Sequence, residues 1–489
     1  MDNDSSIKGA LKWTTSAEVV AKIISPITTM VLARLLDPSA FGVVATVNMV
    51  ISLAEVFSDA GFQKYIVQRQ FSDEKKEDMS ICVAFWTNMA ITVFAFLLIV
   101  INNATIADAV GSSGYGLVLI VASLSLPITA FSSIQKAILK KLFLFKPLSV
   151  VRMVTKFVPF LVTVPLAFLG FSFWAIIIGN LIGGLAEAVI LAILSPWNPK
   201  WQYSFALLKE MAQFCIWTFL EAISSWCITN IGVLFITIAF SSYFVGVYKV
   251  ALTTVDQIIS IVSVSTVSVL YSSLSLLQND DTKFVNTIQK FQRVVGYITI
   301  PLGVGFLVFR DWVTLIFLGD QWADSTLLIG LWGFVASESI IFGTFCGTAL
   351  MAKGKPHFQV VSNSIQLVLL AIAFGAGSYI HDFTVIVVLS TVARVQVPIT
   401  GVILLKKVSG YKLSVLMSQI WQPIVAACAM GTVAVLLLRF SSSLLWGAVS
   451  MCLCVAVYLG IMILIPSSRG QLFALLKSKI SDRFVAGGK

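Results

Sequence analysis

The chain has 489 residues, of which 58% are hydrophobic and only 11% are charged, and its mean hydropathy is +0.94. A soluble domain carries about 25% charged residues, so this composition excludes an ordinary soluble protein and indicates a membrane protein. The formal net charge of +10 would also suit a nucleic-acid-binding protein. The distribution of that charge along the chain favours a different explanation.

Apolar stretches follow one another from the region of Lys22 to Pro466, separated by short polar segments. Most of them have the length of about 20 residues that a helix needs to cross a bilayer. Because backbone polar groups in oil must be satisfied within the segment itself, we expect an all-α polytopic membrane protein with about 14 transmembrane helices. The predicted spans lie near residues 14–34, 41–59, 79–101, 116–135, 148–169, 174–194, 213–238, 246–270, 293–310, 326–351, 359–380, 384–405, 421–440 and 445–465.

A short internal repeat suggests how these helices are grouped. Phe41-Gly42-Val43 recurs as Val245-Gly246-Val247, in each case at the start of a predicted helix. We therefore expect a six-helix lobe over residues 1–208 and a second six-helix lobe over 209–408, both in the same orientation because each holds an even number of spans. Residues 409–489 would add two helices and a basic tail.

Most of the 33 lysines and arginines fall in the leader, in alternate loops and in the tail, whereas the opposite loops carry mainly aspartates. This asymmetry is the positive-inside pattern of membrane proteins, and it places both termini in the cytoplasm. It also explains the net charge without a nucleic-acid partner.

Several ionisable residues lie within predicted spans, where burial costs at least about 2.5 to 3.5 kcal/mol per charge. They are Glu18, Lys22, Glu55, Asp59, Arg152, Lys156, Glu187, Glu221, Asp256, Glu338 and Arg394.

Arg152 and Lys156 are the most informative of these charges. Their i, i+4 spacing puts two like charges on one helix face, which is unfavourable unless water or an anion lies opposite. Together with Lys22 and Arg34 they would line a cavity for a multivalent anion such as a pyrophosphate. The alternatives are that Arg152 reaches the headgroup region and that Lys22 pairs with Glu18.

Three acids in the second half, Glu221, Asp256 and Glu338, are candidates for binding a coupling cation or proton. Structural pairing with Lys249 or Arg394 is the alternative explanation.

No catalytic motif is present in the sequence: there is no Walker A loop, G-x-S-x-G elbow, H-E-x-x-H helix or kinase set. With only two histidines, and seven cysteines that all fall in predicted spans, neither a metal site nor a cofactor is expected. We therefore predict a transporter rather than an enzyme.

The amino-terminal part of the chain carries phrases that resemble a known family. These are Ala33-Arg-Leu-Leu-Asp-Pro-Ser-Ala-Phe-Gly42, Asp59-Ala-Gly-Phe-Gln-Lys-Tyr-Ile-Val-Gln-Arg69, Phe85-Trp-Thr-Asn88, Gln135-Lys-Ala137, Phe145-Lys-Pro-Leu148 and Phe173-Trp-Ala175. They are similar to those of Wzx-type polysaccharide repeat-unit flippases of the multidrug/oligosaccharidyl-lipid/polysaccharide exporter superfamily. The resemblance is strong over residues 1–200 and rests mainly on topology thereafter.

This resemblance implies a flippase that moves an undecaprenyl-pyrophosphate-linked oligosaccharide across the bacterial inner membrane for O-antigen, capsule or exopolysaccharide synthesis. It implies two six-helix lobes around a cationic cavity, and a polysaccharide polymerase and chain-length complex as a candidate partner. The pyrophosphate of the implied substrate would suit the cations named above.

Two alternatives remain at this point. A drug/cation antiporter of the same fold would have a more acidic or aromatic cavity, and the Arg152 and Lys156 face argues against it. A membrane polysaccharide polymerase or ligase would be an enzyme, and it would be expected to have a large extracytoplasmic loop, whereas the loops here are short.

Overall fold

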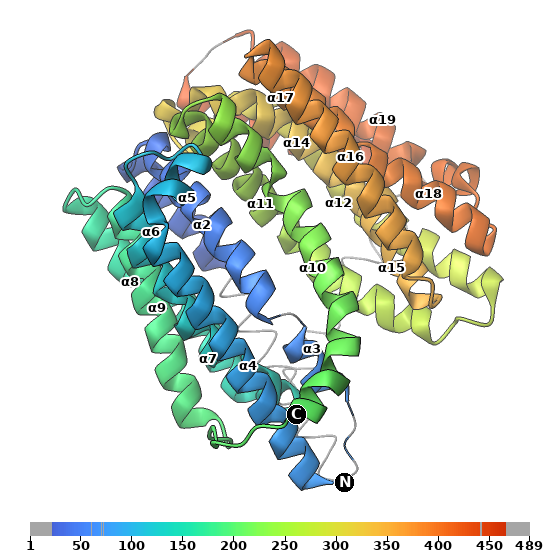
Figure 1. The fold of residues 1–489 in the computed structure, drawn as a ribbon. Coiled ribbons are helices and arrows are strands. Elements are labelled where there is room, and N and C mark those ends of the chain that lie inside the picture. The colour runs from blue at the N-terminus through green and yellow to red at the C-terminus, as the bar shows by residue number, and fades with distance from the viewer. Residues whose placement is uncertain (1–21, 60, 70, 72, 441–442, 466–489) are drawn as a thin grey trace, which may run out of the picture. The chain divides into compact units, whose positions relative to one another are not determined.

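The structure is a computed structural model that describes residues 22–59, 61–69, 71, 73–440 and 443–465. All regular elements in these ranges are helical (Figure 1), so the predicted all-α fold is confirmed. Residues 22–35 are helical and form the described part of the predicted first span. Residues 14–21 of that span lie outside the described residues.

The remaining helices follow in chain order. They are α2 (Pro38–Asp59), α3 (Phe62–Gln68), α4 (Glu74–Ile101), α5 (Asn103–Ala109), α6 (Gly116–Ser123), α7 (Ser125–Lys141), α8 (Phe145–Phe168), α9 (Phe173–Leu194), α10 (Phe205–Ala239), α11 (Ser242–Ser275), α12 (Asp281–Val308), α13 (Arg310–Phe317), η1 (Asp320–Ser325), α14 (Thr326–Ser339), η2 (Ile340–Thr344), α15 (Phe345–Ala352), α16 (His357–Ile380), α17 (Phe383–Arg394), α18 (Gln396–Ser409), α19 (Leu413–Leu437) and α20 (Leu444–Leu464).

Within the described residues, thirteen helical stretches are long and apolar enough to cross a membrane. They correspond to the second to fourteenth predicted spans, and their order along the chain is as expected. The chain is therefore a multi-pass membrane protein.

Two predicted spans are each built from two helices. The span near 116–135 divides at Leu124 into α6 and α7, and the span near 384–405 divides at Val395 into α17 and α18. In both cases a proline, Pro127 or Pro398, is the third residue of the second helix. A proline cannot donate to the carbonyl four residues earlier and its ring collides with it, so the helical hydrogen bonding is interrupted there, although Leu124 and Val395 keep right-handed helical φ and ψ angles.

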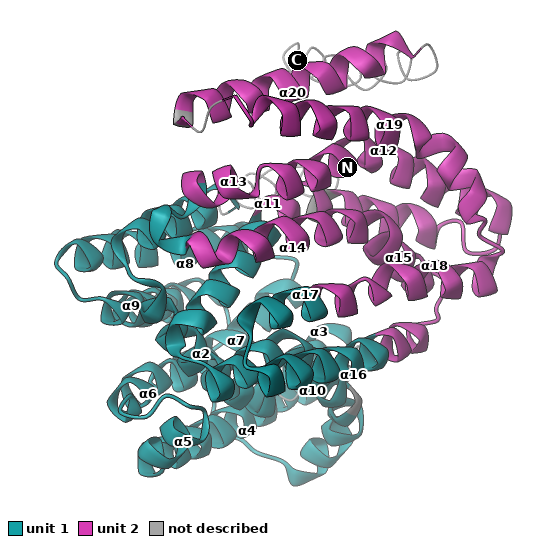
Figure 2. Cartoon of the chain, turned by 90° about the horizontal axis from the view of Figure 1, so that it is seen from above, with its two compact units in different colours: residues 1–257, 317–322, 363–390 teal, residues 258–316, 323–362, 391–489 magenta. Residues whose placement is uncertain are grey.

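The described chain divides into two compact units, coloured separately in Figure 2. Unit 1 comprises residues 1–257, 317–322 and 363–390, and unit 2 comprises residues 258–316, 323–362 and 391–489. Unit 1 thus contains α10 and the first half of α11. The division into lobes at residues 208 and 408 stays a prediction.

In unit 1, α2 and α11 approach each other at the repeated tripeptides. A Cβ atom on Gly42 would overlap the carbonyl oxygen of Ser242, and one on Gly246 would overlap the carbonyl oxygen of Pro38. The two contacts are reciprocal, because Ser242 and Pro38 each precede a glycine by four residues. Only glycine allows helix backbones to come this close.

Unit 1 also contains the end of the first helix together with residues 317–322. The Trp322 side chain is fully buried, and its Nε1 donates to the carbonyl oxygen of Ala33 at 2.8 Å. Gln321 donates to the carbonyls of Ala33 and Leu36. The last carbonyls of a helix lack partners within the helix, and here distant side chains supply them.

Unit 2 is held together by α12, α14 and α19 and by buried polar side chains. Gln292 on α12 donates to the carbonyl oxygen of Ile341 at 2.8 Å and accepts from the Tyr411 hydroxyl at 2.9 Å. The Tyr458 hydroxyl on α20 donates to the carbonyl oxygen of Tyr297 on α12 at 2.8 Å. These bonds satisfy polar groups that would otherwise be costly in oil.

Candidate functional site

Unit 1 contains an open cavity of about 810 Å³, lined by the first helix and by α2, α3, α4, α7, α10 and α11. Its volume falls within the range of about 300 to 1,000 Å³ typical of small-molecule sites. The polar and charged residues that line it are Thr29, Asn48, Ser52, Glu55, Ser58, Asp59, Gln63, Lys64, Asn88, Thr129, Ser133, Thr218, Ser225, Trp226, Thr229, Asn230, Lys249 and Thr253. A cavity so rich in polar groups inside transmembrane helices indicates a site for a hydrophilic ligand.

One face of α2 supplies a row of polar groups to this cavity. Asn48, Ser52, Glu55 and Asp59 are separated by four, three and four residues, which places them along one side of a helix. Because α2 packs against α10 and α7, this polar face is turned away from lipid and towards the cavity.

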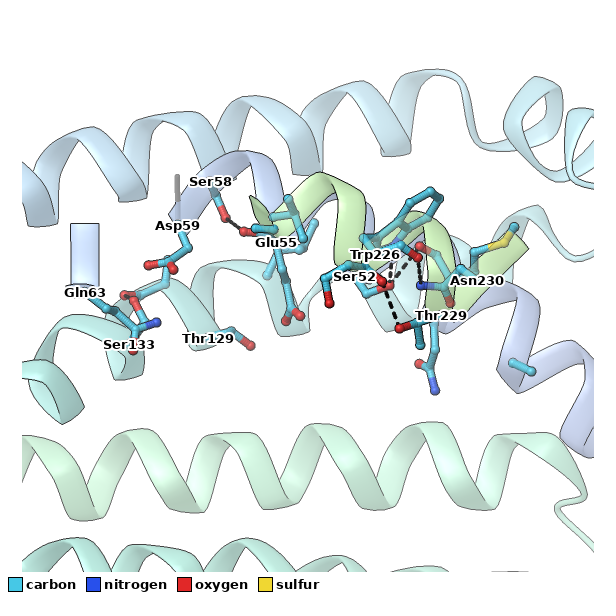
Figure 3. Close-up of a pocket in the computed structure, with 18 of the residues that line it drawn as sticks. Ser52, Glu55, Ser58, Asp59, Gln63, Thr129, Ser133, Trp226, Thr229 and Asn230 are labelled. Atoms are coloured by element: carbon cyan, nitrogen blue, oxygen red, sulfur yellow. Dashed lines mark hydrogen bonds between the residues drawn. The ribbon is translucent and has the colours of Figure 1, made fainter. Parts of the chain in front are cut away.

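Asp59 lies at one end of the cavity, and Glu55 lies between Asp59 and Ser52 (Figure 3). The Thr129 side chain hydrogen-bonds the Glu55 carboxylate, and Gln63 hydrogen-bonds Asp59 through both its side chain and its backbone. Even so, Oδ1 of Asp59 is buried and accepts no hydrogen bond. A buried acceptor of this kind normally has a partner, so this oxygen is an exception among the buried polar atoms of the site.

Trp226 on α10 lies at the other end of the cavity, beside Ser52 (Figure 3). Its indole Nε1 donates to the Ser52 hydroxyl at 2.9 Å, and the Asn230 amide donates to the Trp226 backbone carbonyl at 3.0 Å. These bonds leave the Asn230 side-chain oxygen with acceptor capacity and hold an aromatic ring at the cavity wall.

Two lysines also line the cavity. Lys64 on α3 forms an ion pair with Glu221 at 2.7 Å, so a carboxylate already neutralises its charge. Lys249 on α11 lies near the Gly42–Gly246 crossing. The cavity is therefore not dominated by cations.

The four cations predicted to bind an anion lie outside this cavity. Arg152 and Lys156 are exposed one turn apart on α8, so the structure does bring this pair to one helix face. Arg34 is exposed near the end of the first helix, and Lys22 is half-buried near its start. The structure does not gather all four into one pocket.

The three predicted coupling acids are also separate. Glu221 is exposed and paired with Lys64, and Asp256 is exposed on α11. Glu338 is half-buried on α14 in unit 2, directly before the π-helical turn η2. In the described chain no three His, Cys, Asp or Glu residues are placed to hold a metal ion.

Sequence reasoning singled out Glu55 and Asp59 as intramembrane charges but gave them no role in the site. The available signal was the spacing of polar residues along α2, which continues from Asn48 through Ser52 to both acids. Trp226 was missed altogether, because an aromatic residue in an apolar span is ordinarily a packing residue.

An all-helical, multi-pass chain with a polar cavity among its spans has the architecture of a membrane transporter. The chain belongs to the family described as "Polysaccharide biosynthesis protein", whose model matches residues 31–327.

Two curated relatives cover 76% and 62% of the chain. It is 22% identical over 385 residues to the lipopolysaccharide biosynthesis protein WzxC of Escherichia coli K12, covering 76% of this chain and 75% of WzxC. It is 21% identical over 305 residues to the succinoglycan biosynthesis transport protein ExoT of Rhizobium meliloti, covering 62% of this chain and 61% of ExoT. Its relatives are thus transport and biosynthesis proteins of surface polysaccharides.

Solved structures share the fold. The inward closed conformation of the lipid II flippase MurJ matches with a TM-score of 0.72 at 14% identity, covering 92% of this chain and 98% of MurJ. An inward-facing multidrug resistance MATE transporter matches with a TM-score of 0.63 at 12% identity, covering 81% of this chain and 96% of that one. The predicted superfamily fold is confirmed, because the chain shares it with these two transporter structures.

Proposed function

We propose that the protein is a flippase that moves an undecaprenyl-pyrophosphate-linked oligosaccharide across the bacterial inner membrane for the synthesis of O-antigen, capsule or exopolysaccharide. The observation that carries this proposal is a large open cavity between transmembrane helices, lined by many polar side chains, in a chain of the polysaccharide biosynthesis family. A hydrophilic oligosaccharide on a lipid carrier needs such a polar path through oil.

In this proposal Lys22, Arg34, Arg152 and Lys156 attract the pyrophosphate. Arg152 and Lys156 are best placed, because two exposed cations one turn apart repel each other unless an anion shields them. Residues 1–208 and 209–408 act as the two lobes, and residues 409–489 form an appendage. Glu221, Asp256 and Glu338 serve as candidates for ion coupling, and a polymerase and chain-length complex receives the product.

Deletion of the gene tests the function directly. We expect the lipid-linked repeat unit to accumulate on the cytoplasmic leaflet and the surface glycan to be lost, with both restored by the wild-type gene. A normal surface glycan in the deletion strain would contradict the proposal.

The double variant Arg152→Ala/Lys156→Ala tests the predicted anion site. Loss of charge-assisted hydrogen bonds, worth about 1.5 to 3 kcal/mol each, predicts a fall of roughly tenfold or more in transport of the lipid-linked unit in proteoliposomes. Lys355→Ala, in the exposed loop between α15 and α16, is the matched control and should transport normally. Undiminished transport by a correctly inserted double variant would remove these residues from the site.

One observation favours a second candidate, an ion-coupled drug/cation antiporter of the same fold. We expected such a protein to have an acidic or aromatic cavity, and the cavity of unit 1 carries Glu55, Asp59 and Trp226. Export of an organic cation such as ethidium by the purified protein, together with a normal surface glycan in the deletion strain, would favour this candidate.

A further inference from the structure

The polar row on α2 provides hydrogen-bonding groups that the protein itself does not use up. Asn48 is exposed at the cavity wall and offers an amide donor and an amide acceptor. Glu55 and Asp59 line the same cavity and are charged acceptors when ionised. These two carboxylates favour a ligand part that brings hydrogen-bond donors.

A pyrophosphate group does not fit this requirement. Its oxygens are acceptors and carry negative charge, and they would face the two carboxylates, whose interaction with them is repulsive. Of the two lysines at the cavity, Lys64 is already paired with Glu221 at 2.7 Å. The charge distribution thus disfavours the phosphate part of a lipid-linked substrate in this cavity.

A sugar ring does fit this requirement. Its hydroxyl groups donate hydrogen bonds, and bonds from hydroxyls to carboxylates are short and strong because the acceptor is charged. Trp226 places an aromatic ring in the cavity lining, and its bond to Ser52 fixes the ring's position. An aromatic side chain that combines an apolar ring with a polar N–H group suits ligands that are partly polar.

Resting on the flippase role proposed above, we propose that the cavity of unit 1 is a saccharide site that receives the hydroxyl-rich, uncharged part of the substrate. Glu55 and Asp59 accept hydrogen bonds from sugar hydroxyls, Asn48 adds a donor, and Trp226 packs against a ring face. The anionic part of the substrate is then held elsewhere, outside the cavity of Figure 3.

Direct binding to the full-length protein in nanodiscs tests this site. The probes are the free repeat-unit oligosaccharide released from the host's own surface glycan, inorganic pyrophosphate, and ethidium. We expect Glu55→Gln and Asp59→Asn to weaken binding of the oligosaccharide roughly tenfold to a hundredfold each, the loss expected when a bond to a charged group is removed. Both changes keep the shape of the side chain.

Glu187→Gln is the matched control. Glu187 is also an acid of a transmembrane helix, but it does not line this cavity and it forms an ion pair with Lys136 at 2.7 Å. We expect it to bind the oligosaccharide as the wild type does. If either acid variant fails to run as a single species in size-exclusion chromatography, Trp226→Phe provides the second test. It removes the indole donor and part of the ring, and it should also weaken binding of the oligosaccharide.

Three outcomes would overturn the saccharide site. The first is unchanged oligosaccharide binding in Glu55→Gln and Asp59→Asn. The second is displacement of the oligosaccharide from the wild-type protein by inorganic pyrophosphate, which would place the anion in this cavity. The third is that the acid variants lose ethidium binding alone, which would identify a cation site.

This test is separate from that of the proposed function. Suppose that the deletion strain accumulates the lipid-linked unit but that Glu55→Gln and Asp59→Asn bind the oligosaccharide as the wild type does. The flippase function would then be supported and the saccharide site would be rejected. A normal surface glycan in the deletion strain would reject the flippase even if the free oligosaccharide binds.

Discussion

Asp78 on α4 anchors the segment that joins α9 to α10. Its Oδ1 accepts from the Trp197 indole at 2.8 Å, and its Oδ2 accepts from the Lys200 ammonium at 2.7 Å. The Trp86 indole donates to the Lys200 carbonyl at 2.8 Å and stacks on Trp201 with ring centroids 4.0 Å apart. One carboxylate thus fixes two residues, Trp197 and Lys200, of a short, otherwise irregular connection.

The Lys200–Asp78 pair predicts a pH effect at this connection. The hydrogen bond and charge of Asp78 raise the pKa of Lys200 above its ordinary value of 10.5. Because the folded pKa is the higher one, the pair stabilises the fold fully below the unfolded pKa, and this contribution is lost as pH rises through the folded pKa. Asp78→Asn keeps an acceptor for Trp197 but should return the pKa of Lys200 towards its ordinary value.

The measurement is the NMR titration of ¹³C-methylated lysines in detergent. Asp108→Asn, a change of an exposed acid on α5, is the control and should leave the pKa of Lys200 as in the wild type. An unchanged pKa in Asp78→Asn would show that the pair does not form in solution.

At the scale of elements, the close approach of α2 and α11 predicts that replacing either crossing glycine by alanine destabilises the protein. Gly42→Ala and Gly246→Ala each place a methyl group on a backbone carbonyl of the opposite helix, so the helices must separate. Overpacking of this kind costs about 1 to 3 kcal/mol. We expect both variants to lower the thermal unfolding temperature in detergent, and to similar extents because the contact is reciprocal.

Gly460→Ala on α20 is the matched control, because a Cβ atom there has open space around it. Alanine is the better helix former, so this variant should unfold at the wild-type temperature or slightly above it. Equal unfolding temperatures for Gly42→Ala and Gly460→Ala would mean that the crossing is looser than described.

The positions of the described spans were predictable because an apolar run of about 20 residues has one solution in a bilayer. The extents were less so, because α10, α11 and α12 continue into polar sequence beyond the predicted spans. The interruptions at Leu124 and Val395 were not predictable. Pro127 and Pro398 marked the places, but proline inside a span is compatible with a kink as well as with a break. Which occurs depends on the neighbouring helices, which a local pattern does not contain.

The site was less predictable than the spans, for a physical reason. Glu55 and Asp59 are visible in the sequence, but the cavity that they line also needs α10, whose Trp226 bonds Ser52 of α2 across 174 residues of chain. The cations were chosen by the charge of the expected ligand, and they lie outside the cavity. Their role in binding the anion stays a prediction.

At the scale of the whole molecule, unit 1 is built from three separate parts of the chain. Phe374 on α16 is fully buried, and its ring meets those of Tyr248 and Phe235 at centroid distances of 5.8 and 6.3 Å. A fragment of residues 1–316 lacks this helix and exposes both partners. We expect it to aggregate when expressed alone.

Co-expression of residues 317–489 should restore a single species in size-exclusion chromatography, because it returns α16 and residues 317–322. A fragment of residues 1–316 that is monodisperse and stable alone would contradict the division into units.

Gln321 and Trp322 donate hydrogen bonds to backbone carbonyls at the end of the first helix. These bonds can form only after residues 321 and 322 have been synthesised. The ribosome makes Ala33 nearly 290 residues before it makes Trp322. Throughout that interval the nascent helix end must find other donors, such as water or the translocation machinery. The end of the first helix therefore acquires its final hydrogen bonds only after about two thirds of the polypeptide has been translated.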